Sequence, residues 1–198
     1  MRPALPPARD GTPYRVAVVC LGNICRSPMA AVVLADRIEA AGLGDRVEVA
    51  SAGTGGWHVG GPMDPRAASL LTRHGYDATR HRAQQLGVEW LARFDLLLAM
   101  DAQNHEAVSE LGPAPHLLMF RDFDPVTSRG RDVPDPYFGG DDGFERVLHL
   151  VERTADGLVD ALADELANDP VPEDRPTTGA AVQDSPTEPH SRTRPSSA

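Results

Sequence analysis

The chain has 198 residues, of which 41% are apolar and 24% are charged, and its formal net charge at pH 7 is −10. This length and composition suit one domain with a real core, and no apolar run approaches the ~18 residues that a membrane span needs. The acidic balance argues against a nucleic-acid-binding protein. Two cysteines are too few for a disulfide framework or for a four-ligand zinc site of their own.

The two ends of the chain differ in composition from its middle. Residues 1–13 are rich in proline and lack the apolar core of a signal peptide, so we expect a loose leader and a cytoplasmic protein. Residues 168–198 are rich in Pro, Ser and Thr, and they cannot bury enough apolar surface to offset their ordering entropy. We therefore expect a disordered tail and a folded domain at residues 14–167. We also expect a monomer.

Apolar runs alternate with amphipathic segments between these ends. Residues 14–20 (YRVAVVC) have the pattern of a buried strand, and residues 27–42 have the pattern of a helix. Ser27 is predicted at the N-cap of this helix, Pro28 in its first turn and Gly42 at its end. The elements predicted after it are, in chain order, strand 46–53, helix 64–75, helix 88–94, strand 95–100, helix 101–112 with Asp101 as its cap, strand 116–120 and helix 141–166.

This alternation predicts the fold class. Strands that alternate with helices form right-handed βαβ units, and hence a parallel sheet with helices on both faces. We predict an α/β fold, a three-layer sandwich around a central four-stranded parallel sheet. Ligands of such folds bind at the carboxyl ends of the strands. Because Cys20 ends the first strand, a ligand is expected at the loop that follows it.

The loop from Cys20 to Arg26 (CLGNICR) has the composition of an anion cradle. Gly22 and Asn23 tolerate the left-handed backbone that lets successive N–H groups converge on one point. The following helix adds its positive end, and Arg26 adds a planar fork of donors. A phosphate fits there, and sulfate or arsenate fits by the same argument. The expected phosphate-binding residues are Leu21, Gly22, Asn23, Ile24, Cys25 and Arg26.

The same donors stabilise a thiolate at Cys20, beneath the bound phosphorus, where it would act as a nucleophile. The hydroxyl of Ser27 can donate to this sulfur and improve it as a leaving group. Buried cysteines are often inert core residues. The succession of strand, CLGNICRS and helix in a parallel α/β chain favours the catalytic interpretation instead.

A nucleophile of this kind needs an acid for the departing oxygen, and the segment DVPDPYFGG at residues 132–140 offers one. Asp135 lies between two prolines, which stiffen its backbone and fix the direction of its carboxyl group. Such a group suits general acid catalysis. Because Asp-Pro is also a common turn signal, this interpretation of Asp135 depends on the Cys20 loop.

The segments VCLGNICRSPMA and VPDPYFGG together resemble the low-molecular-weight protein tyrosine phosphatases of bacterial type. The resemblance covers residues 14–166, because SAGTGGWHVG, DPRAASLLTRHG, HRAQQL and LLLAMDAQN agree in the same order. It implies hydrolysis of phosphotyrosine in proteins through a cysteinyl-phosphate, with no metal or other cofactor. In this scheme Cys20 is the nucleophile, Arg26 clamps the phosphate, and Asp135 donates the proton.

The resemblance also implies supporting residues. Asn23 would hold the loop through hydrogen bonds that reach Ser51, and Ser27 would support the thiolate. Trp57 and Tyr137 would form aromatic walls on the two sides of the pocket. A flat slot between two aromatic groups accepts a phenyl ring and suits phosphotyrosine.

Three further positions follow from the resemblance. His81 corresponds to a histidine in a structural network. Cys25 corresponds to a second cysteine, which would trap an oxidised Cys20 as a reversible disulfide, although simple loop packing is the alternative role. Phe138 stands where many relatives have a second tyrosine, so regulation by phosphorylation there would be confined to Tyr137.

Other functions share this fold and loop. Protein arginine phosphatases tend to carry threonine at the position of Ile24, and the bulkier Ile24 together with Trp57 favours an aryl phosphate. Arsenate reductases pass oxidising equivalents to additional cysteines, and this chain has none beyond Cys25. A phosphate-binding protein without activity is the third alternative, and the three filled catalytic positions argue against it.

Overall fold

The structure is a computed structural model that describes residues 3–9, 13–126 and 130–167, and the predicted tail at 168–198 lies outside the described residues. Its centre is a parallel four-stranded sheet in the order β2-β1-β3-β4. The strands are β1 (Tyr14–Cys20), β2 (Val47–Gly53), β3 (Leu96–Ala99) and β4 (Leu117–Met119).

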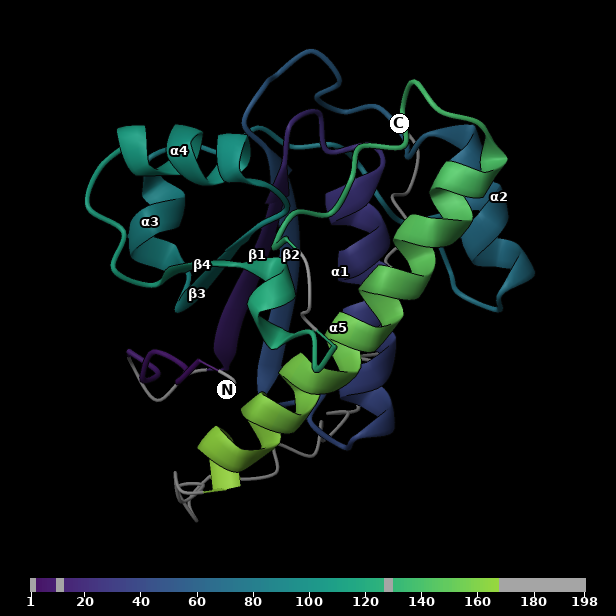
Figure 1. The fold of residues 1–198 in the computed structure, drawn as a ribbon. Helices are drawn as coiled ribbons and strands as arrows, with labels where there is room; N and C mark the ends of the chain where they lie inside the picture. Colours follow the sequence, from purple (N-terminus) through teal and green to yellow (C-terminus); the bar gives the residue numbers. More distant parts are fainter. Residues whose placement is uncertain (1–2, 10–12, 127–129, 168–198) are drawn as a thin grey trace, which may run out of the picture.

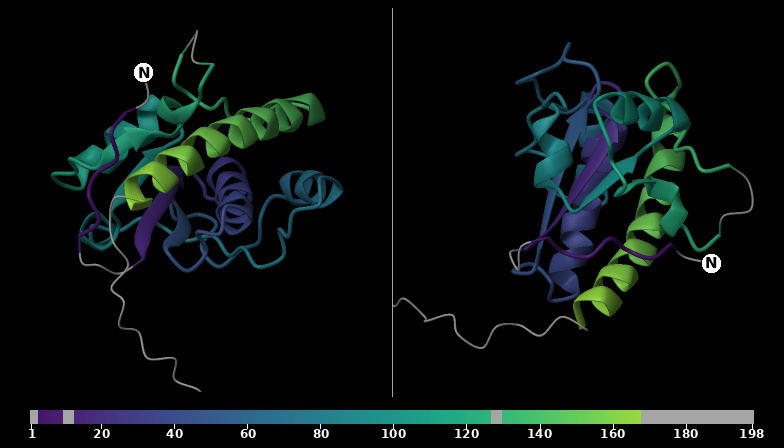
Figure 2. Two further views of the ribbon diagram at one scale, coloured as in Figure 1. Left: turned by 90° about the horizontal axis from the view of Figure 1, so that it is seen from below. Right: turned by 90° about the vertical axis from the view of Figure 1, so that its left-hand side faces the viewer.

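Helices cover both faces of this sheet (Figure 1). They are α1 (Arg26–Ala40), α2 (Pro65–Arg73), α3 (Glu89–Arg93), α4 (Ala102–Glu110) and α5 (Asp141–Ala167), and a 3₁₀ helix, η1 (Phe120–Phe123), follows β4. α1 and α5 lie together on one face, with α2 beside them, and α3 and α4 lie on the other (Figures 1 and 2). The predicted α/β three-layer architecture is confirmed. No helix in the described ranges is long and apolar enough to cross a membrane.

The alternation of side chains along β1 produces two cores. Val16 and Val18 point to the larger core, which they share with residues of α1, α2 and α5. Ala17 and Val19 point to the smaller core on the other face, where Phe94 packs with residues of α3 and α4. β1 pairs with β2 and β3 and is therefore central in the sheet. Because both of its faces are covered by helices, it is apolar almost throughout.

One predicted helix start is wrong, and the others hold. α1 begins at Arg26 with Cys25 at its N-cap, so Ser27 is not the cap. Its hydroxyl is instead bonded to the Cys20 sulfur. Asp101 does cap α4, since its Oδ1 accepts a hydrogen bond from Asn104 N at 2.7 Å.

Residues 3–9 of the predicted leader contact the domain. Leu5 and Ala8 pack against the larger core. The Tyr14 hydroxyl donates to Pro6 O at 2.8 Å, and the Arg9 backbone N–H donates to Asp95 at 3.1 Å. This described part of the leader is therefore attached to the domain by specific contacts.

Candidate active site

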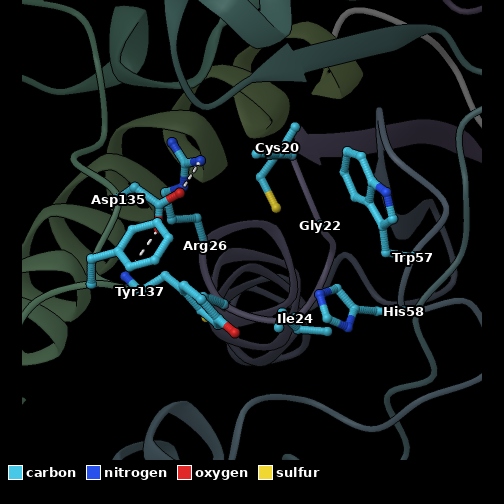
Figure 3. Close-up of a pocket in the computed structure, with 11 residues that line it drawn as sticks. Cys20, Gly22, Ile24, Arg26, Trp57, His58, Asp135 and Tyr137 are labelled. Atoms are coloured by element: carbon cyan, nitrogen blue, oxygen red, sulfur yellow. Dashed lines mark hydrogen bonds and ion pairs between the residues drawn. The ribbon is translucent and has the colours of Figure 1, made fainter.

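The loop between β1 and α1 surrounds the sulfur of Cys20. The sulfur accepts hydrogen bonds from the Ser27 hydroxyl at 3.0 Å and from the Asn23 backbone N–H at 3.3 Å. It faces a pocket at the carboxyl edge of the sheet, where Arg26, Trp57 and other residues surround it (Figure 3). Two donors on one sulfur stabilise negative charge there, as a nucleophilic thiolate requires.

Asn23 is the centre of the hydrogen-bond network beneath this loop. It is fully buried and has a positive φ of 54°, a conformation that asparagine tolerates better than most residues. Its side-chain nitrogen donates to the hydroxyls of Ser27 and Ser51, both at 2.9 Å. Its side-chain oxygen accepts from Gln84 N at 2.8 Å, and its backbone carbonyl accepts from His81 Nε2 at 2.7 Å. The predicted bond from Asn23 to Ser51 is present.

The end of β2 supports the loop from behind. The backbone N–H groups of Thr54 and Gly55 donate to the carbonyls of Cys20 and Leu21, each at 2.9 Å. A Cβ at Gly53 would lie 2.8 Å from Leu21 O, which is too close for any other residue without displacement of the loop. The segment SAGTGG therefore lets two backbones approach closely.

Arg26 is buried and joins three parts of the site. Its Nη1 donates to the carboxylate of Asp101, and its Nη2 donates to Asp135 Oδ2 at 2.8 Å. Nη1 also donates to Val133 O at 3.2 Å. The contact with Asp101 was missed from the sequence, although this residue follows the third strand at the edge where a ligand was expected.

Two aromatic side chains flank the pocket. Trp57 and Tyr137 lie on opposite sides of the Cys20 sulfur (Figure 3), with exposed fractions of 74% and 41%. His58 also points toward the pocket, beside Ile24, and its role was not predicted from the sequence. The residues that line the pocket are Cys20, Leu21, Gly22, Ile24, Cys25, Arg26, Trp57, His58, Asp135, Tyr137 and Phe138.

The Tyr137 wall is held from α2. Arg66 Nη2 donates to Tyr137 O at 3.1 Å, and its guanidinium lies 5.7 Å from the centre of the Tyr137 ring and 4.6 Å from that of Phe144. Asp64 accepts hydrogen bonds from the same guanidinium. These contacts of Arg66 hold the Tyr137 ring in its position at the side of the pocket. No local sequence pattern predicted them.

The two cysteines differ in their surroundings. Burial, and then the nearby charge of Asp64, raises the pKa of the Cys25 thiol to about 12, so Cys25 is protonated at neutral pH. Both cysteines are free. Of the two, Cys20 is therefore the candidate nucleophile, and the reversible disulfide between them stays a prediction.

Two further histidines, His81 and His74, differ in their distance from the pocket. Burial lowers the pKa of His81, whose ring is bonded to the loop. His74 lies at the end of α2, away from the pocket, with its Nε2 at 3.6 Å from Glu145. Within the described ranges, no three His, Cys, Asp or Glu side chains are grouped so that they could hold a metal ion.

The sequence pattern of one protein family, described as low molecular weight phosphotyrosine protein phosphatase, matches residues 15–168. The chain belongs to this family, and the resemblance inferred from the sequence is confirmed.

Individual relatives agree with this assignment. A low molecular weight protein-tyrosine-phosphatase of Streptomyces coelicolor is 48% identical over 158 residues, which cover 77% of this chain and 96% of the relative. The crystal structure of YfkJ from Bacillus subtilis matches with a TM-score of 0.74 at 34% identity, covering 79% of this chain and 99% of that one. DARP, a drosophila arginine phosphatase, matches with a TM-score of 0.68 at 28% identity, covering 74% and 96%.

Proposed function

We propose that this protein hydrolyses phosphotyrosine in proteins through a cysteinyl-phosphate intermediate. The observation that carries the proposal is the Cys20 sulfur, which accepts two hydrogen bonds and faces a pocket that also contains Arg26 and Asp135. The names of the family and of its Streptomyces member support the same activity.

In the first step, the Cys20 thiolate attacks phosphorus opposite the tyrosine oxygen. A P–S bond forms while the P–O bond to the ring breaks, and protonated Asp135 gives its proton to the departing oxygen. The loop N–H groups and Arg26 hold the remaining phosphoryl oxygens and neutralise their charge. These oxygens compete with the Asp135 carboxylate for Arg26 Nη2, so substrate binding weakens the ion pair between the two side chains.

In the second step, water attacks the cysteinyl-phosphate. Asp135, now a carboxylate, takes a proton from this water while the P–S bond breaks and inorganic phosphate is released. The electron pair of the broken bond returns to Cys20 as a thiolate. The Ser27 hydroxyl, 3.0 Å from the sulfur, stabilises this leaving group. The cycle ends with the enzyme as it began, with no oxidation or reduction.

The pocket walls support an aryl substrate. Trp57 and Tyr137 stand on opposite sides of the sulfur, and a phenyl ring between them would bury both of its faces (Figure 3). Phosphoproteins are the substrates that this family implies. A cytoplasmic location and a monomeric state remain predictions.

Hydrolysis of phosphoarginine in proteins is the second candidate, and the structural match to DARP favours it. Against it, Ile24 lines the pocket with an apolar side chain. Two peptides of the same sequence, one with phosphotyrosine and one with phosphoarginine, separate the candidates when inorganic phosphate release is measured. We expect a higher kcat/KM for phosphotyrosine, and the reverse order would support the arginine phosphatase.

The covalent route is tested with Cys20→Ser. We expect its turnover to fall by at least about 10⁴-fold, because the remaining groups bind substrate without a competent nucleophile. Binding of inorganic phosphate, followed by calorimetry, should persist. An active Cys20→Ser variant would contradict the cysteinyl-phosphate, and a wild-type protein that binds phosphate without turnover would be a binding protein.

A further inference from the structure

Arg121 lies outside the pocket, yet it is bonded to the segment that carries Asp135. Its Nη1 donates to Asp132 O at 3.0 Å. Its side chain is 10% exposed and is not part of the pocket lining. Asp132 precedes Asp135 by three residues, so this contact is placed to affect the acid without touching the substrate.

The backbone at Asp132 and Val133 is fixed from several directions. Val133 is fully buried, and its N–H donates to Met100 O at 2.7 Å. The Asp132 carboxylate accepts from Ala102 N at 3.1 Å. From Val133 the chain runs through Pro134 to Asp135, and proline removes one of the rotations that would uncouple the two. A shift at Asp132 is therefore passed on to the Asp135 carboxyl group.

A buried carboxylate holds Arg121 in place. The Asp124 side chain is fully buried, and its Oδ2 accepts from Arg121 Nε and Nη2 at 3.3 and 3.2 Å. Arg153 of α5 donates to both oxygens of Asp124 at 2.7 Å. Hydrogen bonds from Arg153, more than those from Arg121, lower the pKa of Asp124 to about 2, so it is charged at neutral pH.

The backbone that carries Arg121 is also fixed in place. η1, which contains Arg121, rests on α5 at Gly157, where an added Cβ would collide with Phe123 O. Arg121 thus lies between a rigid support and residues 130–140, the segment that carries Asp135 and is called the acid segment below. Its planar fork allows one guanidinium to bond Asp124 and Asp132 O together, which a lysine ammonium does not reproduce.

We propose that Arg121 is a positioning residue for the general acid: anchored by Asp124, it holds the backbone at Asp132 so that Asp135 points at the leaving oxygen. This rests on the proposed phosphatase function. Loss of the contact lets Asp135 depart from its productive direction, and small misplacements of a catalytic group lower rates by up to about 10²-fold.

The test uses the full chain and a series of aryl phosphates whose leaving phenols differ in acidity. With Arg121→Gln, we expect kcat for the most basic phenol to fall roughly tenfold to a hundredfold. For p-nitrophenyl phosphate, whose phenol needs little protonation, the loss should stay within about threefold. At high pH, kcat/KM for phosphates of basic phenols falls because the acid, Asp135, loses its proton. This fall should be shallower in Arg121→Gln than in the wild type.

Arg153→Gln is the matched control, because it removes a guanidinium from the same carboxylate without touching the acid segment. Its leaving-group dependence should match that of the wild type, even where urea unfolding shows an equal loss of stability. Arg121→Lys keeps a positive charge near Asp124 and hence the fold. It should still show the defect with basic phenols, and it decides the matter if Arg121→Gln does not fold.

The outcomes separate the two proposals. A wild-type dependence on the leaving group in Arg121→Lys, or the same defect in Arg153→Gln, would overturn the positioning role while the phosphatase stands. A wild-type protein that releases no phosphate from any aryl phosphate would overturn both. A defect in the two Arg121 variants alone supports the positioning role.

Discussion

The two loops that form the site are held in different ways. The phosphate loop, residues 20–26, runs directly from β1 into α1, so both of its ends belong to regular structure. The acid segment, residues 130–140, has no helix or strand. Its backbone near Val133 is fixed because Asp132 O accepts a hydrogen bond from Arg121 and Val133 N–H donates one to Met100 O. The first is built to present fixed donors, whereas the second carries a group that must exchange a proton and accept a new neighbour when substrate arrives.

This comparison separates activity from stability. Changes in the acid segment should lower activity and leave the free energy of unfolding nearly unchanged. Changes beneath the phosphate loop should lower both, because the loop network is buried and shared with the core.

After Cys20→Ser, the largest effect on activity is expected for Asp135→Ala. General acid catalysis contributes about 10²–10⁴-fold, so kcat for phosphates of basic phenols should fall within that range. The Asp135 side chain is 41% exposed, and Arg26 keeps its bond to Asp101, so the free energy of unfolding should change by less than about 0.5 kcal/mol.

The control for Asp135→Ala is p-nitrophenyl phosphate, for which the loss should be smallest because its leaving group needs little protonation. Equal losses across the leaving groups would remove Asp135 from the acid role. A large loss of stability would contradict the contrast between the two loops.

Asn23→Ala, unlike Asp135→Ala, should lower the stability of the protein as well as its activity. The substitution removes three side-chain hydrogen bonds and places alanine at a φ of 54°. Unpaired buried groups and the strained backbone together should cost roughly 2–4 kcal/mol in the free energy of unfolding. The loop donors then lose their convergence, and kcat should fall by about a hundredfold.

Asn23→Gly is the matched variant, because glycine accepts the positive φ but lacks the side chain. Urea unfolding of both variants divides the loss between backbone and hydrogen bonds. Wild-type stability in Asn23→Ala would show that the network does not hold the loop.

The phosphate loop and the contacts between distant parts of the chain also differ in how well the sequence predicts them. The phosphate loop is contiguous, and the sequence indicated where it lies because a strand, a loop and a helix leave a local signal. The phosphate-binding role of its residues stays a prediction. The Ser27 cap was predicted wrongly, because serine favours N-caps. The hydrogen bond from its hydroxyl to the Cys20 sulfur, which was also predicted, is the one that the structure shows.

The missed contacts all join distant parts of the chain. The bond between Arg26 and Asp101 spans 75 positions, and that between Arg66 and Tyr137 spans 71. Such pairs are set by how the elements pack, and a single sequence carries no spacing that marks them. The predicted sheet and its helices were recovered for the reverse reason, because each is encoded by a short periodic run.

Ser27→Ala tests the phosphate loop more gently. The hydroxyl donates to the sulfur, and a hydrogen bond to a charged group contributes about 1.5–3 kcal/mol, so its loss should slow the release of phosphate from Cys20 by roughly ten- to a hundredfold. Rapid mixing with p-nitrophenyl phosphate should then show a burst of nitrophenol, as the intermediate accumulates. A uniform loss without a burst would place the effect of Ser27 in the first step.

The smallest expected effect is the contribution of His81, beneath the phosphate loop, to the pH dependence of stability. His81 Nε2 donates to Asn23 O, and burial lowers the pKa of His81 below its reference value of 6.5. As the pH falls below 6.5, unfolded His81 binds a proton that the folded protein excludes until its own lower pKa is reached. The contribution of His81 to the free energy of unfolding is therefore fully present above pH 6.5. It should decline as the pH falls from 6.5 to the lower pKa of the folded state.

His81→Gln isolates this contribution, because the glutamine amide can still donate to Asn23 O but does not titrate. Burial also lowers the pKa of His116, so part of the pH dependence should remain in the variant. Urea unfolding at pH 7.5 and at several lower values should give a shallower slope for His81→Gln than for the wild type, and equal slopes would contradict the assignment. The acid segment contains no histidine. Mild acid should therefore loosen the support of the phosphate loop through His81, whereas the hydrogen bonds that hold the acid segment near Val133 involve no histidine.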